Sequence, residues 1–96
     1  MTKNKLIYIL LSSYNGEKYI EEQINSLINQ THKNWKLLIR DDGSSDKTID
    51  IIKKFEKKDK RVSLIKSSGN LGSCKSFLHL FAYTKKNFKP EYIMFC

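Results

Sequence analysis

Two adjacent carboxylates, Asp41 and Asp42, end an apolar run within residues 37–48, LLIRDDGSSDKT. One Asp is enough to bond the backbone of an ordinary turn. An ionised carboxylate accepts hydrogen bonds and donates none. Asp42 could therefore accept the N3–H of uracil or thymine, while unprotonated cytosine presents only an acceptor there. The structural alternative is that one Asp caps a helix and the other forms an Asx turn.

Two further loops carry groups that suit a nucleotide. The first, residues 12–16 (SSYNG), offers small hydroxyls at Ser12 and the flat ring of Tyr14, which could lie over a base. The second, residues 67–75 (SSGNLGSCK), has glycines that allow close backbone approach and Lys75 near a helix start. The spacing matches neither a P-loop nor a GxGxxG fingerprint. By themselves, both loops could also be plain strand-to-helix turns.

These loops must be positioned by the elements between them. Short apolar runs predict strands over residues 6–11, 35–40, 61–66 and 91–96. Helical periodicity predicts helices over about 17–30 and about 73–86, and between them a helix that Ser44 or Ser45 can cap, with Asp46 in its first turn. In the third helix, Phe77, Leu78, Phe81 and Ala82 are expected to face inward. Strands that alternate with helices predict an α/β fold with a mainly parallel sheet of about four strands, flanked by helices in three Rossmann-like layers. Ligands of such sheets bind outside the carboxyl ends of the strands, where all three loops emerge.

Composition bounds the class of protein. The chain has 96 residues, 40% of them apolar and 29% charged, which fits one globular domain, and its net charge of +8 favours anionic partners. The lysine-rich stretch at residues 53–61 is interpreted as the solvated face and end of a helix. Cys74 and Cys96 have no metal or redox spacing, and His32 and His79 lack ligand partners, so reduced thiols and a cytoplasmic protein are expected. The run at residues 6–11 is too short for a membrane span.

The three loops, in this order, resemble the family 2 glycosyltransferases, inverting enzymes with the GT-A fold. The matching stretches are residues 6–55, from LIYILLSSYNGEKY through DDGSSDKT to IIKKF, and residues 65–77, IKSSGNLGSCKSF. The resemblance implies that the chain is the nucleotide-binding portion of a sugar transferase. Its nucleotide-binding residues would be Ser12, Ser13, Tyr14, Asn15, Asp41, Asp42 and Lys75, with Asp42 on the pyrimidine N3–H, Asp41 supporting it and Tyr14 near the base. Ser12 departs from the proline common at the start of the first loop.

The same resemblance implies components beyond this chain. The metal-binding D-x-D motif should follow the fourth strand, and the sequence ends at Cys96, so residues 1–96 are expected to be an incomplete domain. Mg²⁺ or Mn²⁺, the catalytic base and most of the acceptor site would belong to the full-length enzyme, and no metal is expected in this chain. The donor would be a UDP- or dTDP-sugar and the acceptor a glycan or lipid-linked precursor of a bacterial surface polysaccharide. We expect nucleotide binding without transferase activity by this chain alone, peripheral association with the inner membrane face, and self-association through an open sheet edge.

Two other classes of protein stay in view. A basic nucleic-acid-binding module would follow from the net charge of +8, although no nucleic-acid partner is expected under the main reading. A receiver-type signalling domain has similar size and topology, but it needs an acidic pair after the first strand and an Asp after the third. Here the acidic pair follows the second strand, and no Asp ends the third.

Overall fold

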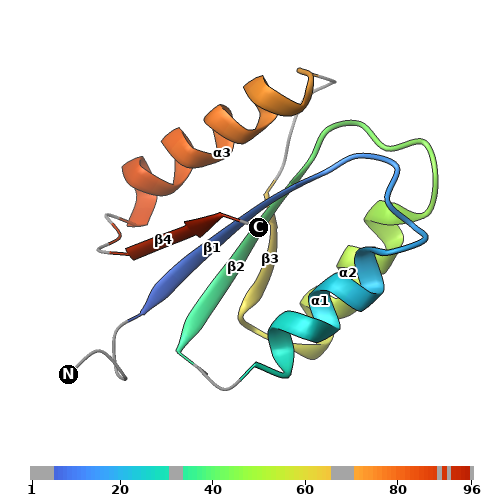
Figure 1. The fold of residues 1–96 in the computed structure, drawn as a ribbon, viewed down its shortest axis with the longest axis horizontal. Coiled ribbons are helices and arrows are strands. Elements are labelled where there is room, and N and C mark those ends of the chain that lie inside the picture. The colour runs from blue at the N-terminus through green and yellow to red at the C-terminus, as the bar shows by residue number, and fades with distance from the viewer. Residues whose placement is uncertain (1–5, 31–33, 66–70, 89, 91, 96) are drawn as a thin grey trace.

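Strands and helices alternate along the part of the chain that the structure describes. The computed structural model describes residues 6–30, 34–65, 71–88, 90 and 92–95 (Figure 1). Its elements are β1 (Ile7–Ser13), α1 (Ile20–Ile28), β2 (Trp35–Asp41), α2 (Thr48–Lys58), β3 (Val62–Ile65), α3 (Ser73–Phe88) and β4 (Tyr92–Phe95). Each strand and helix expected from the sequence is present, with ends that shift by a few residues.

The sheet is parallel throughout, in the order β3-β2-β1-β4. Helices α1 and α2 cover one face, and α3 covers the other (Figure 1). The α/β fold with three layers is therefore confirmed. The chain builds outward from β1 through β2 to β3 and then crosses back to place β4 on the other side of β1. The sheet thus changes direction between β1 and β4, the kind of point at which open α/β sheets bind ligands.

Burial on both faces explains why the central strands are continuously apolar. Ile9 and Leu37 point toward α1 and α2, and Leu10 and Leu38 point toward α3. All four side chains are at most 1% exposed. Because neighbouring residues of a strand face opposite sides, a strand covered on both sides needs apolar residues at every position. β1 and β2 therefore form the rigid centre from which the candidate loops emerge.

The inner face of α3 differs from the expected one. Leu80, Ser76 and Thr84 are fully buried, whereas Leu78 is 60% exposed and Ala82 faces solvent, so the expectation for the last two is wrong. Phe77 and Phe81 are partly buried beside the core, as expected of inward residues. The inner stripe contains two hydroxyl residues whose oxygens are hydrogen-bonded: Thr84 Oγ1 donates to the Leu80 carbonyl at 2.8 Å. A pattern search that counts only apolar residues assigns such a stripe to the surface.

The start of α2 also differs from the sequence-based expectation. The helix begins at Thr48, and neither Ser44 nor Ser45 caps it. Instead, the Asp46 carboxylate accepts hydrogen bonds from the Thr48 amide and hydroxyl. Ser44 and Ser45 therefore lie in the loop that precedes the helix.

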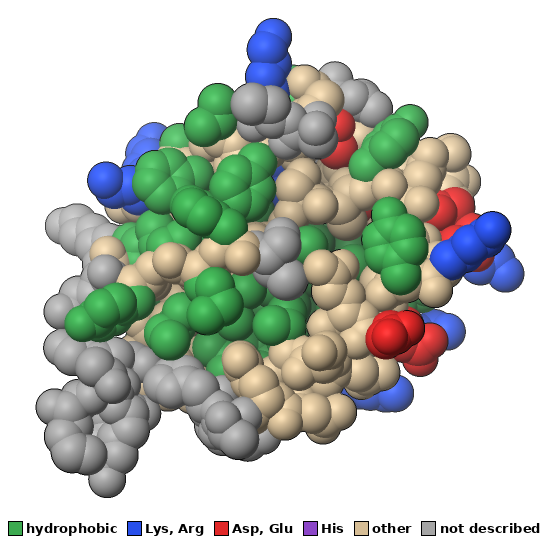
Figure 2. Space-filling model, viewed as in Figure 1, with side chains coloured by type: hydrophobic (Ala, Val, Ile, Leu, Met, Phe, Trp, Pro, Cys, Tyr) green, Lys and Arg blue, Asp and Glu red, His purple; other side chains and the backbone are tan. Residues whose placement is uncertain are grey.

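The outer strand β4 exposes apolar side chains. Tyr92, Met94 and Phe95 are 44–57% exposed, and hydrophobic side chains gather on the face that carries α3 and β4 (Figure 2). Among the strands that the structure describes, β4 pairs with β1 alone. Self-association through this edge stays a prediction. None of the described helices is long and apolar enough to cross a membrane.

Candidate nucleotide-binding site

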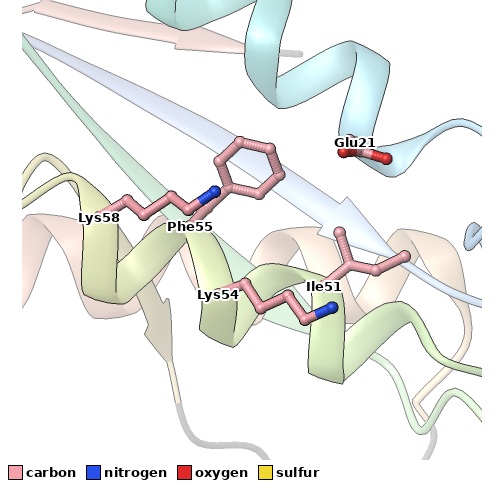
Figure 3. Close-up of a pocket in the computed structure, with 5 residues that line it drawn as sticks. All are labelled: Glu21, Ile51, Lys54, Phe55 and Lys58. Carbon is pink, nitrogen blue, oxygen red and sulfur yellow. The ribbon is translucent and has the colours of Figure 1, made fainter.

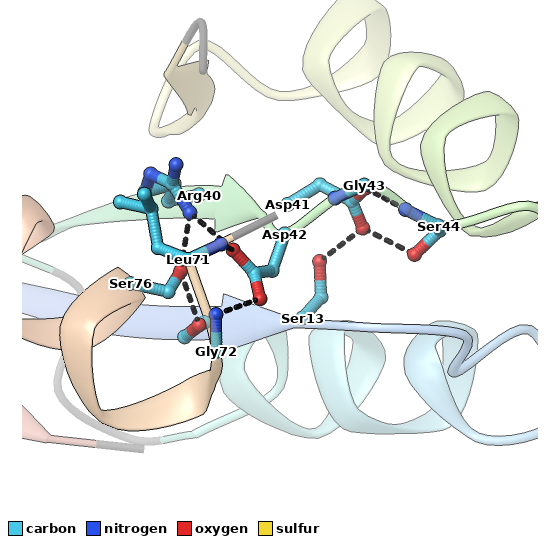
Figure 4. Close-up of polar contacts among 10 residues, drawn as sticks. Ser13, Arg40, Asp41, Asp42, Gly43, Ser44, Leu71, Gly72 and Ser76 are labelled. Atoms are coloured by element: carbon cyan, nitrogen blue, oxygen red, sulfur yellow. Dashed lines mark hydrogen bonds and ion pairs between the residues drawn. The ribbon is translucent and has the colours of Figure 1, made fainter. Parts of the chain in front are cut away.

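The candidate site lies where β1 and β2 end side by side. Ser13 and Asp41 are register partners at the carboxyl ends of these strands, and the Asp42 amide donates to the Ser13 carbonyl at 2.8 Å. Leu71 and Gly72, which lead into α3, lie against the same point (Figure 4). Because all strands are parallel, loops far apart in sequence meet at one edge of the sheet.

Asp41 is enclosed by hydrogen-bond donors. Its Oδ1 accepts from the Ser13 and Ser44 hydroxyls at 2.8 and 2.6 Å, and its Oδ2 accepts from the amides of Gly43 and Ser44 at 3.2 and 2.7 Å. The residue is 3% exposed. Gly43 has a φ of +87°, which an L-residue adopts only with strain. Asp41 therefore holds β1 and the turn after β2 in one arrangement.

Asp42 faces the opposite way, toward α3, and is held by an ion pair. Its Oδ1 accepts from Arg40 Nη1 at 2.8 Å and from the Leu71 amide at 2.7 Å, and its Oδ2 accepts from the Gly72 amide at 2.9 Å. The Leu71 amide, followed by Arg40 and the Gly72 amide, lowers the pKa of Asp42 below its usual value, although burial opposes this shift. The carboxylate is therefore ionised at neutral pH. Among the described contacts, Oδ2 accepts one hydrogen bond, and a carboxylate oxygen can accept a second.

Arg40 and Ser76 belong to the site although the sequence analysis did not select them. Arg40 is 1% exposed, and its Nη1 also donates to Ser76 Oγ at 2.6 Å. Ser12 Oγ donates to the same Ser76 oxygen at 2.9 Å. A signal was present in the sequence, because Arg40 alternates with the apolar Leu38 in a buried strand and lies two residues from a carboxylate. A buried arginine requires such a partner.

The first and second loops are fastened to each other. The Asn15 amide donates to Ser44 Oγ at 2.7 Å, and Asn15 Oδ1 accepts from the Ser45 amide at 2.8 Å. Next to it, the Gly16 amide donates to Thr48 Oγ1 at 2.8 Å. Asn15 has a φ of +47°, in the left-handed region that Asn tolerates better than most residues. The two loops thus form one preassembled unit.

The residues expected to bind nucleotide divide into two groups. The structure brings Ser12, Ser13, Asn15, Asp41 and Asp42 into the hydrogen-bonded cluster described above. Tyr14 is 52% exposed beside it, and Lys75 is exposed in the first turn of α3. Both lie outside these hydrogen bonds, so their contact with a nucleotide stays a prediction. Residues 66–70 of the third loop lie outside the described residues.

The acidic pair does not fit a divalent cation. Metal ions of this kind need several free carboxylate or carbonyl oxygens, whereas the oxygens of Asp41 and Asp42 already accept N–H and O–H donors. Within the described part of the chain, no three His, Cys, Asp or Glu residues come together in a way that could hold a metal.

A separate hollow lies between α1 and α2 (Figure 3). It is lined by Glu21 from α1 and by Ile51, Lys54, Phe55 and Lys58 from α2. None of these residues belongs to a loop that follows a strand. Two of the lining residues are apolar, Ile51 and Phe55, and the other three carry charges of both signs. This hollow has no connection with the cluster around Asp42.

Comparison with known proteins gives the family. The description "Glycosyl transferase family 2" matches residues 8–96. A relative in Escherichia coli, the UDP-Glc:alpha-D-GlcNAc-diphosphoundecaprenol beta-1,3-glucosyltransferase WfgD, is 43% identical over 60 residues, which are 62% of this chain and 23% of that protein. The chain spans about a quarter of the length of the curated relatives it matches.

Solved structures agree with this match. TarS 1–349 of S. aureus is 27% identical and superposes with a TM-score of 0.76 over 94% of this chain and 26% of that chain. The mannosyltransferase PcManGT of Pyrobaculum calidifontis, solved with GDP-Man and Mn²⁺, is 15% identical with a TM-score of 0.71, over 80% of this chain and 24% of that one, and shows a shared fold. These neighbours are GT-A glycosyltransferases, and divalent metal use is found among them. The receiver and nucleic-acid readings are not favoured, and the chain belongs to glycosyltransferase family 2.

Proposed function

We propose that residues 1–96 are the nucleotide-binding portion of an inverting glycosyltransferase that uses a UDP- or dTDP-sugar. The observation that carries this proposal is the ionised Asp42 carboxylate, fixed at the end of β2 with acceptor capacity left on Oδ2. A uracil or thymine N3–H could donate to that oxygen. Tyr14, exposed on the neighbouring loop, would cover the base, with Ser12, Ser13 and Asn15 shaping the first loop and Asp41 holding the second. Lys75 would approach the phosphates.

The rest of the reaction is assigned to other parts of the protein. Release of a nucleoside diphosphate requires stabilisation of the charge that develops on its phosphates, and attack by the acceptor requires a positioned base. Mg²⁺ or Mn²⁺ would supply the first in the full-length enzyme. The described residues of this chain hold no site that fits the metal. We propose that the chain alone binds nucleotide and transfers no sugar.

The acceptor is proposed to be a glycan or lipid-linked precursor in bacterial surface polysaccharide synthesis. The support is the E. coli relative, whose name states a diphosphoundecaprenol acceptor. An acceptor anchored in the membrane would require the enzyme to work at the inner membrane face, and the basic surface of this chain suits that place.

Calorimetric titration of the chain with UDP, CDP, GDP and a short oligonucleotide tests the donor. UDP should bind about tenfold or more tightly than CDP, because cytosine would set an acceptor against a carboxylate. Guanine also has a ring N–H donor. A preference for GDP would therefore agree with an enzyme that uses a nucleotide sugar, but it would overturn the proposal that the donor is a UDP- or dTDP-sugar. Preference for the oligonucleotide would overturn the transferase proposal.

Two variants of the same chemical type sharpen this experiment. Asp42→Asn replaces the proposed base-reading carboxylate by an amide and should remove most of the UDP preference over CDP. Asp50→Asn makes the same change at an exposed position of α2 and should keep it. Circular dichroism must show that both variants are folded. Equal UDP preference in the folded Asp42→Asn protein would contradict the role of Asp42.

A further inference from the structure

Arg40 is a buried cation with a defined set of partners. It lies in β2 on the α3 side, and its Nη1 bridges Asp42 Oδ1 and Ser76 Oγ at 2.8 and 2.6 Å (Figure 4). The side chains of Arg40 and Asp42 are 1% and 3% exposed. Burying both charges is costly unless they are paired with good geometry. A fully buried strand position would be filled at lower cost by a leucine, so the arginine needs another explanation.

The pair determines which oxygen of Asp42 is available. Arg40 and the Leu71 amide both donate to Oδ1, whereas Oδ2 takes the Gly72 amide alone among the described contacts. Each carboxylate oxygen has about two acceptor directions. Oδ1 is therefore satisfied, and the open direction is on Oδ2. Rotation of the carboxylate would break the ion pair and the two amide bonds together, which fixes this assignment.

Two other elements hold the arginine itself. Ser76 of α3 accepts the second bond from Nη1, and Ser12 of β1 donates to the same Ser76 oxygen at 2.9 Å. Arg40 is thus tied to β1 and α3 as well as to its own strand. Any displacement of α3 relative to the sheet would be transmitted to Asp42 through this guanidinium.

We propose that Arg40 is a positioning residue for nucleotide recognition, which pins Asp42 Oδ1 and so presents Oδ2 to a ring N–H of the base. This inference rests on the proposed nucleotide-binding function. Of the charged side chains at this site within the described residues, that of Asp41 is bonded on the side of Ser13 and Ser44, and that of Lys75 is exposed in the first turn of α3. Arg40 is the one that contacts Asp42 directly.

The experiment compares UDP binding by the whole 96-residue chain with that of Arg40→Met and Arg40→Lys. Arg40→Met should weaken UDP binding by about tenfold at pH 7, because the carboxylate loses a charged donor and its fixed orientation. Lys36→Met removes a cation from an exposed position of the same strand and should leave UDP binding unchanged. Arg40→Lys keeps a cation at the position and should recover most of the lost affinity.

A pH series separates positioning from general structural damage. The wild-type carboxyl has a lowered pKa, so it stays ionised as the pH falls. Loss of Arg40 should raise that pKa, and the ratio of the Arg40→Met to wild-type dissociation constants should grow between about pH 7 and pH 4.5. UDP phosphates titrate alike in both experiments and cancel in this ratio. Arg40→Lys should restore the wild-type profile, which a merely space-filling role would not require.

The outcomes are distinct. A folded Arg40→Met protein that binds UDP within about twofold of wild type at both ends of the series would overturn the role of Arg40. Absence of UDP binding by wild type, or equal binding by Asp42→Asn, would instead count against the proposed function. If Arg40→Met does not fold, Ser76→Ala replaces it, since it removes one support of Arg40 and keeps the charge. Unchanged affinity together with an unchanged carbon-13 titration of the Asp42 carboxyl in Ser76→Ala would also overturn the proposal.

Discussion

Ser13 and Asp41 end two neighbouring parallel strands and are joined by a 2.8 Å hydrogen bond from the serine hydroxyl to the carboxylate. This contact aligns the start of the loop after β1 with the start of the loop after β2, at the carboxyl-end edge of the sheet. Asp42, the next residue, then faces α3 on the other side of β2. The two adjacent carboxylates thus bind partners on different sides of the sheet, because consecutive residues at a strand end point to opposite faces.

Asp41→Ala should destabilise the chain more than Ser13→Ala. The first change leaves several buried donors without an acceptor and should cost about 2–4 kcal/mol, whereas the second removes one bond and should cost about 1 kcal/mol. Urea unfolding followed by circular dichroism measures both. Equal losses for the two variants would show that Asp41 does not organise the turn.

Asn15→Ala should be more harmful than Asn15→Gly. Both variants lose the side-chain oxygen that accepts from the Ser45 amide, but glycine adopts the observed φ of +47° without strain. The difference in unfolding free energy should be about 1 kcal/mol in favour of glycine. Thermal melts of the two variants give the comparison. A more stable alanine variant would mean that the left-handed conformation is not maintained in solution.

Asp59 and Arg61 should make stability depend on acid pH. The Arg61 guanidinium donates two hydrogen bonds to the Asp59 carboxylate, and these bonds lower the pKa of Asp59. In turn, Asp59 raises the pKa of Arg61. The guanidinium also lies over the Trp35 ring, 4.1 Å from its centroid. The folded pKa of Asp59 is lower than the unfolded value of about 3.9. The stability it adds is therefore complete above about pH 5 and is lost as the pH falls through the folded pKa.

Asp59→Asn tests this dependence. At pH 7 it should lower the melting temperature by about 2–5 °C. The difference from wild type should close below about pH 4, because the wild-type carboxylate is then being protonated. Asp50→Asn, on the exposed face of α2, should follow the wild-type curve. A gap between Asp59→Asn and wild type that widens in acid would contradict the assigned direction of the pKa shift.

The exposed lysines of α2 should direct the chain to anionic membranes. Lys53, Lys54 and Lys57 lie with Lys47 around one side of this helix. Sedimentation with vesicles that contain anionic lipid should show binding at low salt that falls as salt is added, with about 1 kcal/mol for each lysine near the surface. Lys53→Glu with Lys57→Glu should abolish most of it. Lys85→Glu with Lys86→Glu makes the same charge change at the end of α3. An equal loss of vesicle binding in that variant would indicate that binding depends on net charge and not on the lysines of α2.

The sequence by itself determined the order and type of the elements. Uninterrupted apolar runs such as residues 6–11 can be satisfied only where both faces of a strand are covered, and this requirement led directly to a parallel sheet between helices. The acidic pair and the residues of the first loop could likewise be predicted from the sequence, because parallel strands bring their carboxyl ends together. Local pattern and topology were sufficient for these points.

Only the tertiary structure decided how the polar residues pair. Neither Arg40 nor Ser76 was selected as a site residue from the sequence. Arg40 bonds to Asp42, two residues away just after the end of β2, and to Ser76, 36 residues away on α3. Leu78 was misplaced because the inner face of α3 includes two hydroxyl residues: Ser76, which is bonded to Arg40, and Thr84, which is bonded to the Leu80 carbonyl of the same helix. Where a buried polar residue has its partner elsewhere in the chain, as Ser76 has in Arg40, periodicity along one segment carries no record of that partner.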